Sequence, residues 1–372
     1  MKVGIVTING LFNYGNRLQN FAVSEYLRSL GCDARTLVPQ PYSYRYPMTN
    51  EEKEIEVKIE NGEDLSSVNK NLIKRYNFKA FNEKYIPSDL IKKKKYDDEI
   101  VKKYDKFVTG SDQVLNPTFR SSLGQMENNL LMFAPPYKRA TFAPSLGMEE
   151  IPEKFKGMFY DALTKFPMLS VREESAADII ENLTGRRPKV VIDPTLMVDR
   201  ARWEEVAKPL AGFDYDSPYI LYYFLGDKYV EMPVELNTAL NREKSQYKLR
   251  EVVINDPQDE VVKTAGPAEF LDLFKNASLV VTDSFHGAVF SIIFGKPFVT
   301  VQRTVRAGNE EIDMSGRIKT LLKELGLERK LLKTNGFTHE SIMEADYNEC
   351  YGKLRLLQNE QAEFLKAALK VV

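Results

Sequence analysis

Short runs of β-branched and aromatic residues alternate along the chain with longer segments whose apolar residues recur at helical spacing. The first run, over residues 3–8, predicts a buried strand that ends at a turn. A segment with helical spacing over residues 15–30 follows, and Gly31 closes it. A second run over residues 34–38 completes a strand–helix–strand unit, which is typical of a parallel sheet.

The alternation continues toward the C-terminus and falls into two sets of elements. At 372 residues the chain exceeds the roughly 250–300 residues that one hydrophobic core usually serves. We therefore expect an α/β protein with two Rossmann-like, doubly wound domains that face a ligand cleft in a GT-B-like arrangement. Further strands are predicted over residues 106–109, 139–143, 168–171, 190–192, 219–224, 249–254, 279–282 and 298–301, and further helices over residues 267–276, 285–294, 315–325 and 350–370.

The boundary between the two domains is expected after residue 198. The N-terminal domain covers residues 1–198 and the C-terminal domain residues 199–372, whose last helix can pack back on the N-terminal domain. Residues 199–218 include Pro209 and Gly212 and are predicted to form the linker.

A charge-dense segment at about residues 42–104 interrupts the N-terminal set of elements. It contains the run Lys92–Lys95, which three acidic residues at 97–99 follow closely. One interpretation is a solvated helical insertion with a polar face. The other is a basic surface that receives an anionic acceptor or lipid headgroups.

Composition and charge exclude several classes of protein. Lys and Arg total 52 against 53 Asp and Glu, a formal net charge of −1, which argues against a general nucleic-acid binder. No run of about 18 apolar residues is present, and the N-terminus lacks the apolar core of a signal peptide, so we expect a cytoplasmic protein. The 2 cysteines and 2 histidines show no metal-ligand spacing, so we expect neither a metal nor another cofactor.

The clearest candidate site follows the strand predicted over residues 279–282. A helix begins there within a few residues, and its N–H groups and dipole attract phosphate or carboxylate. Asp283 or Ser284 can cap this helix, and His286 in its first turn can donate or accept a proton near neutral pH. Gly287 permits close approach of a ligand or of backbone. The alternative is that His286 is a packing residue in a buried helix.

Polar residues also follow predicted strands of the first domain. Arg172 can bind a carboxylate or phosphate through paired hydrogen bonds, or form an ion pair with Glu173 or Asp193. Asp112 can act as a base toward a sugar hydroxyl, or only stabilise its turn. Other residues that can bind hydroxyls or phosphates, or merely cap helices and turns, are Asn13, Gly15, Asn16, Arg17, Ser111 and Gln113.

Taken in order, these motifs resemble the polysaccharide pyruvyl transferase family. The resemblance runs from Val3 to about Leu325, and its last block is the most specific. It is carried by Asn13–Asn16, Gly110–Gln113, Ala143–Gly147, Ser170–Glu173, Asp193–Thr195 and Leu279–Phe298.

The resemblance implies a GT-B-like enzyme that transfers a pyruvyl group from phosphoenolpyruvate to two hydroxyls of one sugar, which gives a cyclic pyruvate ketal. Typical acceptors are lipid-linked saccharide precursors of capsule, exopolysaccharide or cell-wall polymers. The protein would then make at most peripheral contact with a membrane, at the inner membrane surface. His286 matches the family's motif histidine and would be the general acid or base, while Arg172 and the helix start at Phe285 would hold the donor's carboxylate and phosphate.

Two positions depart from the family's usual pattern. The late block reads Ser284-Phe285-His286 where members commonly carry Arg-Leu-His, and the early loop has Asn16 where an aspartate is frequent. The late substitution removes a positive charge that would help to bind the donor. The arginines that could replace it follow the next predicted strand, namely Arg303, Arg306 and Arg317.

Two other functions fit the same sequence. One is a GT-B glycosyltransferase that uses a nucleotide sugar, which a nucleoside diphosphate would stabilise and phosphoenolpyruvate would not. The other is a non-catalytic saccharide-binding protein, in which replacement of His286 would leave every ligand response unchanged.

Overall fold

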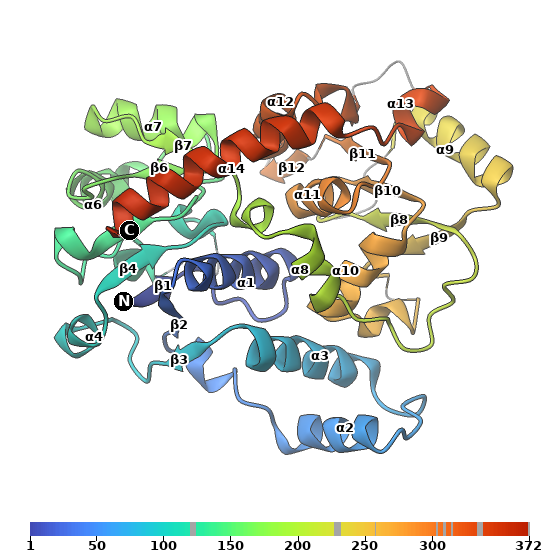
Figure 1. The fold of residues 1–372 in the computed structure, drawn as a ribbon, viewed down its shortest axis with the longest axis horizontal. Coiled ribbons are helices and arrows are strands. Elements are labelled where there is room, and N and C mark those ends of the chain that lie inside the picture. Colours follow the sequence, from blue (N-terminus) through green and yellow to red (C-terminus); the bar gives the residue numbers. More distant parts are fainter. Residues whose placement is uncertain are drawn as a thin grey trace. The chain divides into compact units, whose positions relative to one another are not determined.

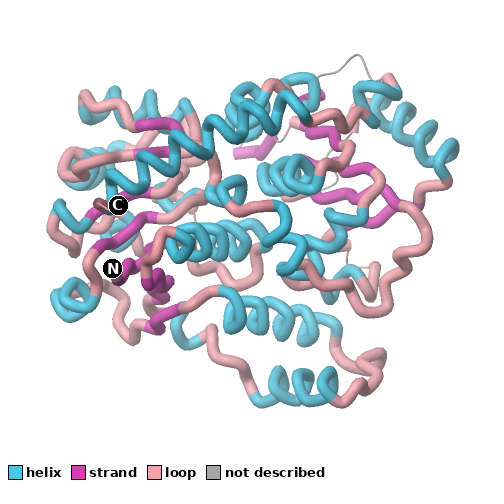
Figure 2. The backbone as a smooth tube through the Cα atoms, in the orientation of Figure 1, coloured by secondary structure: helices cyan, strands magenta, loops and turns pink. Residues whose placement is uncertain are grey.

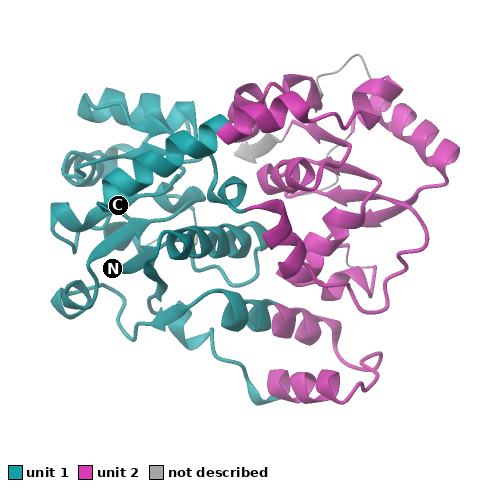
Figure 3. Ribbon diagram, viewed as in Figure 1, with its two compact units in different colours: residues 1–50, 78–198, 356–372 teal, residues 51–77, 199–355 magenta. Residues whose placement is uncertain are grey.

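The computed structural model divides the chain into two compact units (Figure 3). It describes residues 1–119, 124–226, 232–256, 258–302, 304–307, 310–313, 315–332 and 338–370. Unit 1 comprises Met1–Asn50, Phe78–Val198 and Leu356–Val372. Unit 2 comprises Glu51–Asn77 and Asp199–Arg355.

A five-stranded parallel sheet forms the centre of unit 1 (Figure 1). Its strand order is β3-β2-β1-β4-β5, so the direction in which the chain adds strands reverses between β1 and β4. The reversal creates a topological switch point, where ligands of such sheets bind beyond the carboxyl ends of the strands. The strands are β1 (Lys2–Val6), β2 (Asp33–Val38), β3 (Ser88–Leu90), β4 (Lys106–Thr109) and β5 (Arg139–Thr141).

A second, two-stranded parallel sheet follows β5 in the chain. It pairs β6 (Ser170–Val171) with β7 (Lys189–Val190). The two sheets join through backbone just beyond their strands, because Arg172 N donates to Pro144 O at 3.1 Å, and Pro144 forms a parallel bridge with Asp112. The carboxyl ends of β4, β5 and β6 are thereby tied together.

Helices of unit 1 cover the five-stranded sheet and bury its apolar side chains. The core cluster contains residues of β1, β2 and β4 together with residues of four helices. Tyr104 and Phe107 of this cluster pack ring against ring at 5.6 Å. The helices are α1 (Tyr14–Ser29), α4 (Asp98–Lys103), α5 (Met126–Asn129), α6 (Glu153–Leu163) and α7 (Glu174–Thr184), and α3 (Lys70–Tyr85) and α14 (Asn348–Leu369) run across the boundary between the units in the sequence.

Unit 2 has its own five-stranded parallel sheet (Figure 2). The order β14-β11-β10-β8-β9 places the reversal between β8 and β10. The strands are β8 (Tyr219–Tyr223), β9 (Arg250–Val253), β10 (Leu279–Thr282), β11 (Phe298–Val301) and β14 (Leu331–Leu332), with an antiparallel pair β12 (Thr304–Ala307) and β13 (Glu310–Asp313). The helices are α2 (Asn50–Glu60), α8 (Arg200–Val206), α9 (Val234–Tyr247), α10 (Pro267–Asn276), α11 (Phe285–Phe294), α12 (Gly316–Leu325) and α13 (His339–Met343).

The predicted class, α/β with parallel sheets, is confirmed by these two sheets. Strong apolar runs gave accurate bounds, since α10, β10, α11 and β11 begin and end at the predicted residues. The prediction of a linker over residues 199–218 was wrong in part. The segment contains α8, whose Trp203 is fully buried and packs edge-to-face on Phe290 with ring centroids 5.0 Å apart.

The interpretation of residues 42–104 as a solvated insertion also needs correction. Strand β3 lies within this segment and pairs with β2 in the sheet of unit 1, and Phe78 is fully buried. The lysine run is partly neutralised, because Lys93 Nζ lies 2.6 Å from Asp97 and 2.8 Å from Glu99. None of the helices in the described part of the chain has the length and apolar character to cross a membrane.

Candidate active site

The connection after β4 brings a carboxylate to the switch point of the unit 1 sheet. The side chain of Asp112 accepts hydrogen bonds from Asn16 Nδ2 and, at 2.9 Å, from Gln113 N. Neighbouring Ser111 is fully buried, and its Oγ donates to Asp193 Oδ2 at 2.9 Å. The structure therefore brings four predicted site residues together in one hydrogen-bonded group: Asn16, Ser111, Asp112 and Gln113.

The backbone of Asp112 adopts a conformation that almost only glycine favours. Its φ is 65° and its ψ is −173°. A non-glycine residue in this region stores roughly 1–3 kcal/mol of strain and persists only where its surroundings enforce it. Ser145 N and Val114 N enforce it here by donating to Asp112 O at 2.8 and 2.7 Å. Because such strain is concentrated at functional sites, Asp112 is a strong candidate for a functional residue.

Arg172 follows β6, and its side chain is only 1% exposed. Nη1 donates to Asp193 Oδ2 and, at 3.3 Å, to Ser111 Oγ, while Nη2 lies 3.5 Å from Asp112 Oδ1. Burial opposes the charged form, but three neighbouring carboxylates outweigh it and raise the pKa of Arg172. The ion pair between Arg172 and Asp193, which the sequence predicted as one role of this arginine, is present in the structure.

Glu173 anchors the connection that follows β5. Its Oε1 accepts from Ser145 Oγ at 2.7 Å, from Leu146 N at 2.9 Å and from Gly147 N at 3.2 Å. Gly147 has φ 59°, and a Cβ there would meet Gln113 Cδ at 2.6 Å, so only glycine fits. The sequence suggested Glu173 only as an ion-pair partner, and its role as the acceptor for this turn was missed.

Asp193 was predicted only as a possible ion-pair partner of Arg172, and its hydrogen bonds to Ser111 and Thr195 were missed. Its Oδ1 accepts from Thr195 N at 2.9 Å and from Thr195 Oγ1 at 2.6 Å, while its Oδ2 binds Ser111 and Arg172. The signal was present, because Asp193-Pro194-Thr195 follows a predicted strand end.

The loop after β1 supplies helix caps and one buried cation. Asn13 Oδ1 accepts from Asn16 N at 3.0 Å and caps α1, and Gly15 is buried in the first turn. Arg17 is fully buried; its Nη2 donates to Ile8 O at 2.7 Å and its Nη1 to Tyr46 Oη at 2.8 Å. Through these contacts Arg17 holds the loop in place. Its side chain is buried and is not exposed to a substrate.

In unit 2, the connection between β10 and α11 lies beside the switch point of that sheet. The carboxylate of Asp283 accepts from Leu225 N at 2.7 Å and from Gly226 N at 3.1 Å, which ties the loop after β8 to this connection. Ser284 Oγ accepts from Gly287 N at 3.4 Å and caps α11. The predicted helix start and its cap are thus found at the predicted residues.

His286 is the second residue of α11 and is 6% exposed. Its ring packs edge-to-face on Phe285, which is equally buried, with centroids 5.4 Å apart. The other histidine, His339, begins α13, and its Nδ1 lies 2.9 Å from Glu243 Oε2. Of the two histidines, only His286 follows the carboxyl end of a sheet strand.

Gly287 allows α11 to begin close against β10. A Cβ at this position would overlap the side chain of Thr282, whose Cβ would lie 2.9 Å away. Thr282 cannot easily move, because its Oγ1 donates to Tyr223 O at 2.6 Å and accepts from Ser284 N at 3.0 Å. The glycine therefore sets the position of the first turn of α11, which carries His286.

We predict that Gly287→Ala destabilises the protein by about 1–3 kcal/mol, the usual cost of overpacking, although alanine favours helix. Urea unfolding monitored by circular dichroism measures the change. The matched control is Gly157→Ala in α6, where an added Cβ meets nothing within 4 Å, and we expect it to be neutral or stabilising. Equal stability of both variants would contradict the close contact at Gly287.

The three arginines proposed to supply a positive charge differ in where they lie. Arg317 is partly exposed in the first turn of α12, and Arg306 lies on β12. Arg303 lies outside the described residues.

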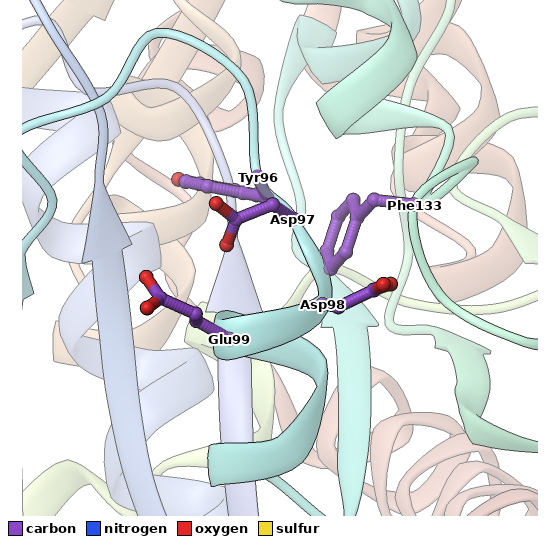
Figure 4. Close-up of a pocket in the computed structure, with 5 residues that line it drawn as sticks. All are labelled: Tyr96, Asp97, Asp98, Glu99 and Phe133. Carbon is purple, nitrogen blue, oxygen red and sulfur yellow. The ribbon is translucent and has the colours of Figure 1, made fainter.

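A pocket of about 420 Å³ in unit 1 is formed at the start of α4 (Figure 4). It is lined by Tyr96, Asp97, Asp98, Glu99 and Phe133, none of which was predicted as a site residue. The carboxylates of Asp97 and Glu99 lie on the same side of the helix start in Figure 4, in agreement with their shared partner Lys93. The acidic lining of this pocket does not suit a negatively charged donor substrate.

Within the described residues, no cluster of three or more His, Cys, Asp or Glu suited to a metal is found.

Comparisons with solved structures find distant similarity over the whole chain. The Anabaena protein HepE in complex with UDP is 12% identical, with a TM-score of 0.49 over 99% of this chain and 100% of that one. MnaA from S. aureus is also 12% identical, with a TM-score of 0.46 over 100% and 98% of the two chains. Similarity this low carries no information on what this chain binds. None of the curated proteins compared with it matches.

The family comparison is more informative. The model of the family described as polysaccharide pyruvyl transferase matches residues 13–303, which is well over half of the chain. The matched span includes Asp112, Arg172 and Asp193 in unit 1 and His286 in unit 2. The chain therefore belongs to the polysaccharide pyruvyl transferase family.

Proposed function

We propose that the protein transfers a pyruvyl group from phosphoenolpyruvate to two hydroxyls of one sugar and forms a cyclic ketal on a precursor of a surface polysaccharide. The proposal is supported by family membership over residues 13–303 and, above all, by the position of His286. An imidazole in the first turn of a helix that follows a sheet strand can meet an anion held by the helix N-terminus.

The reaction needs proton transfers at two kinds of atom. One sugar hydroxyl adds to C2 of the enol phosphate while the CH₂ carbon gains a proton and becomes a methyl group. The C2–O bond to phosphate then breaks, and the second hydroxyl attacks the resulting oxocarbenium-like carbon and loses its proton. The hydroxyls give up two protons in total; one goes to the methyl group and the other leaves with phosphate.

His286 is the proposed group that donates or accepts one of these protons. Its burial, at 6% exposed, reduces competition from bulk water, and its first-turn position places it where the dipole of α11 favours negative charge. A positioned acid or base of this type contributes roughly 10²–10⁴ in rate. We propose that no metal or other cofactor takes part and that phosphoenolpyruvate is a substrate.

The proposed acceptor is a lipid-linked saccharide precursor, whose lipid would keep the protein in peripheral contact with the inner membrane surface. Because Ser284 stands where an arginine is common in the family, the donor's charge needs another cation. Arg317, partly exposed in the first turn of α12, is the described arginine proposed for this task.

A thermal-shift experiment tests the donor. Phosphoenolpyruvate at a hundred times its Kd should stabilise the native state by about 2.7 kcal/mol, whereas a nucleotide sugar such as UDP-N-acetylglucosamine should leave the melting temperature unchanged. Inorganic phosphate is the control for a general anion effect. If only the nucleotide sugar raises the melting temperature, the proposed donor is wrong and a glycosyltransferase is the better assignment.

A further inference from the structure

Phe12 differs from the other phenylalanines in its exposure to solvent. It is 50% exposed, and among the phenylalanines that the structure describes it is the only exposed one. It lies in the loop after β1, directly before Asn13, which caps α1. Further along this connection, Asn16 Nδ2 donates to Asp112, so the loop borders the switch point where ligands of such sheets bind. An apolar ring is therefore exposed where a ligand is expected.

The start of α1 does not explain why a large apolar side chain occupies this position. The residue before a helix cap often packs on an apolar residue in the second turn of the helix, which forms a hydrophobic staple. The residue in that place here is Arg17, which is buried and donates to Ile8 O at 2.7 Å and to Tyr46 Oη at 2.8 Å. A charged side chain with these partners is not the apolar residue of a staple, so helix capping does not account for Phe12.

The ring of Phe12 is held in place by its surroundings. Leu11, the residue before it, is only 8% exposed and belongs to a small apolar cluster. The ring itself packs edge-to-face on the fully buried Phe78 of α3, with centroids 5.7 Å apart and 77° between the planes. Tyr14 of α1 supports Phe78 in turn, at 5.0 Å between centroids. Because the ring is fixed before a ligand arrives, little conformational entropy is lost when a ligand covers it.

The residue next to Phe12 offers hydrogen-bond donors. Asn13 is partly exposed, and its Oδ1 accepts from Asn16 N at 3.0 Å, whereas its Nδ2 donates to none of the described residues. An amide NH₂ group carries two donors, which hydroxyl oxygens can accept. An aromatic ring beside a few polar groups is the typical lining of a site for a small molecule.

A sugar in its pyranose form matches this combination. The faces of a pyranose ring carry C–H bonds, and its rim carries hydroxyls. The face of a phenyl ring is electrostatically negative and attracts the slightly positive hydrogens of such C–H bonds. Phosphoenolpyruvate, which carries a carboxylate and a phosphate on a three-carbon unit, has no comparable apolar face. The loop after β1 is therefore better suited to a sugar than to this donor.

We propose that Phe12 is the platform on which one face of the acceptor sugar stacks, that Asn13 Nδ2 donates to one of its hydroxyls, and that the acceptor sugar is therefore a pyranoside. The identification of this sugar as the acceptor rests on the proposed function, whereas the binding of a pyranoside at Phe12 does not. Phe12 takes no part in the chemical steps and acts through the affinity for the acceptor.

Fluorescence tests the binding of a sugar without the donor. The chain contains 1 tryptophan, Trp203, which is fully buried, so Phe12→Trp adds an exposed reporter at the platform. Titration with the methyl glycosides of glucose, galactose, mannose and N-acetylglucosamine should shift or quench the added emission, to saturation for at least one of them. Glucitol, a linear polyol that has hydroxyls but no ring, should leave the emission unchanged.

The matched control is Tyr160→Trp in α6 of the same unit, where the native ring is 49% exposed. Its emission should respond to none of the glycosides. A saturable response of Phe12→Trp alone supports the platform. The inference is overturned if no glycoside changes the emission of Phe12→Trp, or if Tyr160→Trp responds equally.

Turnover supplies a second readout. Phe12→Ala should raise the KM for the acceptor about 10–100-fold and leave the KM for phosphoenolpyruvate unchanged, because the exposed ring face is lost from the contact. Phe12→Tyr keeps the ring and should restore the KM for the acceptor. Phe12→Leu keeps an apolar side chain against Phe78 but has no flat face, and it should resemble Phe12→Ala. Equal KM values for the acceptor in Phe12→Leu and Phe12→Tyr would mean that only apolar bulk matters and would contradict the platform.

The two readouts separate this inference from the proposed function. If the wild type releases no phosphate from phosphoenolpyruvate with any acceptor, the proposed function fails, while the titration of Phe12→Trp still decides whether a pyranoside binds at this position. If turnover occurs and Phe12→Ala has the wild-type KM for the acceptor, the proposed function stands and the platform is wrong.

Discussion

His286→Gln should lower the rate of phosphate release from phosphoenolpyruvate and acceptor by about 10²–10⁴ while the protein remains folded. Glutamine fills a similar volume but does not exchange protons near neutral pH. The residue is 6% exposed in the first turn of α11, where Ser284 caps the helix independently of the imidazole, so the fold does not depend on His286 as an acid or base. A coupled phosphate assay with a panel of saccharide acceptors measures the rate.

The chain offers a matched control for this variant, because it contains only one other histidine. His339 lies at the start of α13 beside Glu243, and we expect His339→Gln to retain wild-type turnover. Unfolding in urea shows whether His286→Gln keeps its stability. Wild-type turnover in a folded His286→Gln protein would exclude the imidazole from the chemistry.

The elements that the sequence predicted best are those whose backbone and side chains are both buried. Strand β10 and helix α11 are buried along their whole length and mostly apolar, so each forms one continuous apolar run with clear ends, and their bounds agree with the prediction. Strand β3 was missed, since Ser88–Leu90 is short and only partly buried and reads as a polar turn. Helix α8 was predicted as part of the linker because it has only seven residues, too few to show a helical repeat of apolar positions. Its one large buried side chain, Trp203, does not make a repeat by itself.

The site shows the same division between local and distant information. The cap at Ser284 and the strand end before His286 are local features, and the sequence predicted both. The group around Asp112 also contains Asn16, Arg172 and Asp193, and these four residues follow four different strands (β1, β4, β6 and β7) of two sheets. Arg172 has several polar neighbours, and the one with which it pairs depends on the register of β6 and β7. Residue types alone do not determine this register.

Glu173→Ala should destabilise the protein by about 3–5 kcal/mol, the typical cost of removing one partner from a buried charged group. Glu173 is 1% exposed, and its Oε1 accepts from three donors of the turn over residues 145–147. Alanine would leave those donors buried without an acceptor, and each such loss costs about 1–3 kcal/mol before the turn relaxes. Urea unfolding at pH 7 measures the loss of stability.

Two variants separate the effect of the hydrogen bonds from that of the charge. Glu173→Gln retains an oxygen for Ser145 Oγ and the two backbone N–H groups, so it should lose clearly less stability than Glu173→Ala. Glu174→Ala removes the adjacent glutamate, whose side chain is 55% exposed and pairs only on the surface with Arg187, and should cost less than about 1 kcal/mol. A Glu173→Ala protein as stable as Glu174→Ala would mean that Glu173 does not anchor the turn. Because this turn also holds the backbone of Asp112 through Ser145 N, Glu173→Ala should reduce turnover as well, whereas Glu174→Ala should not.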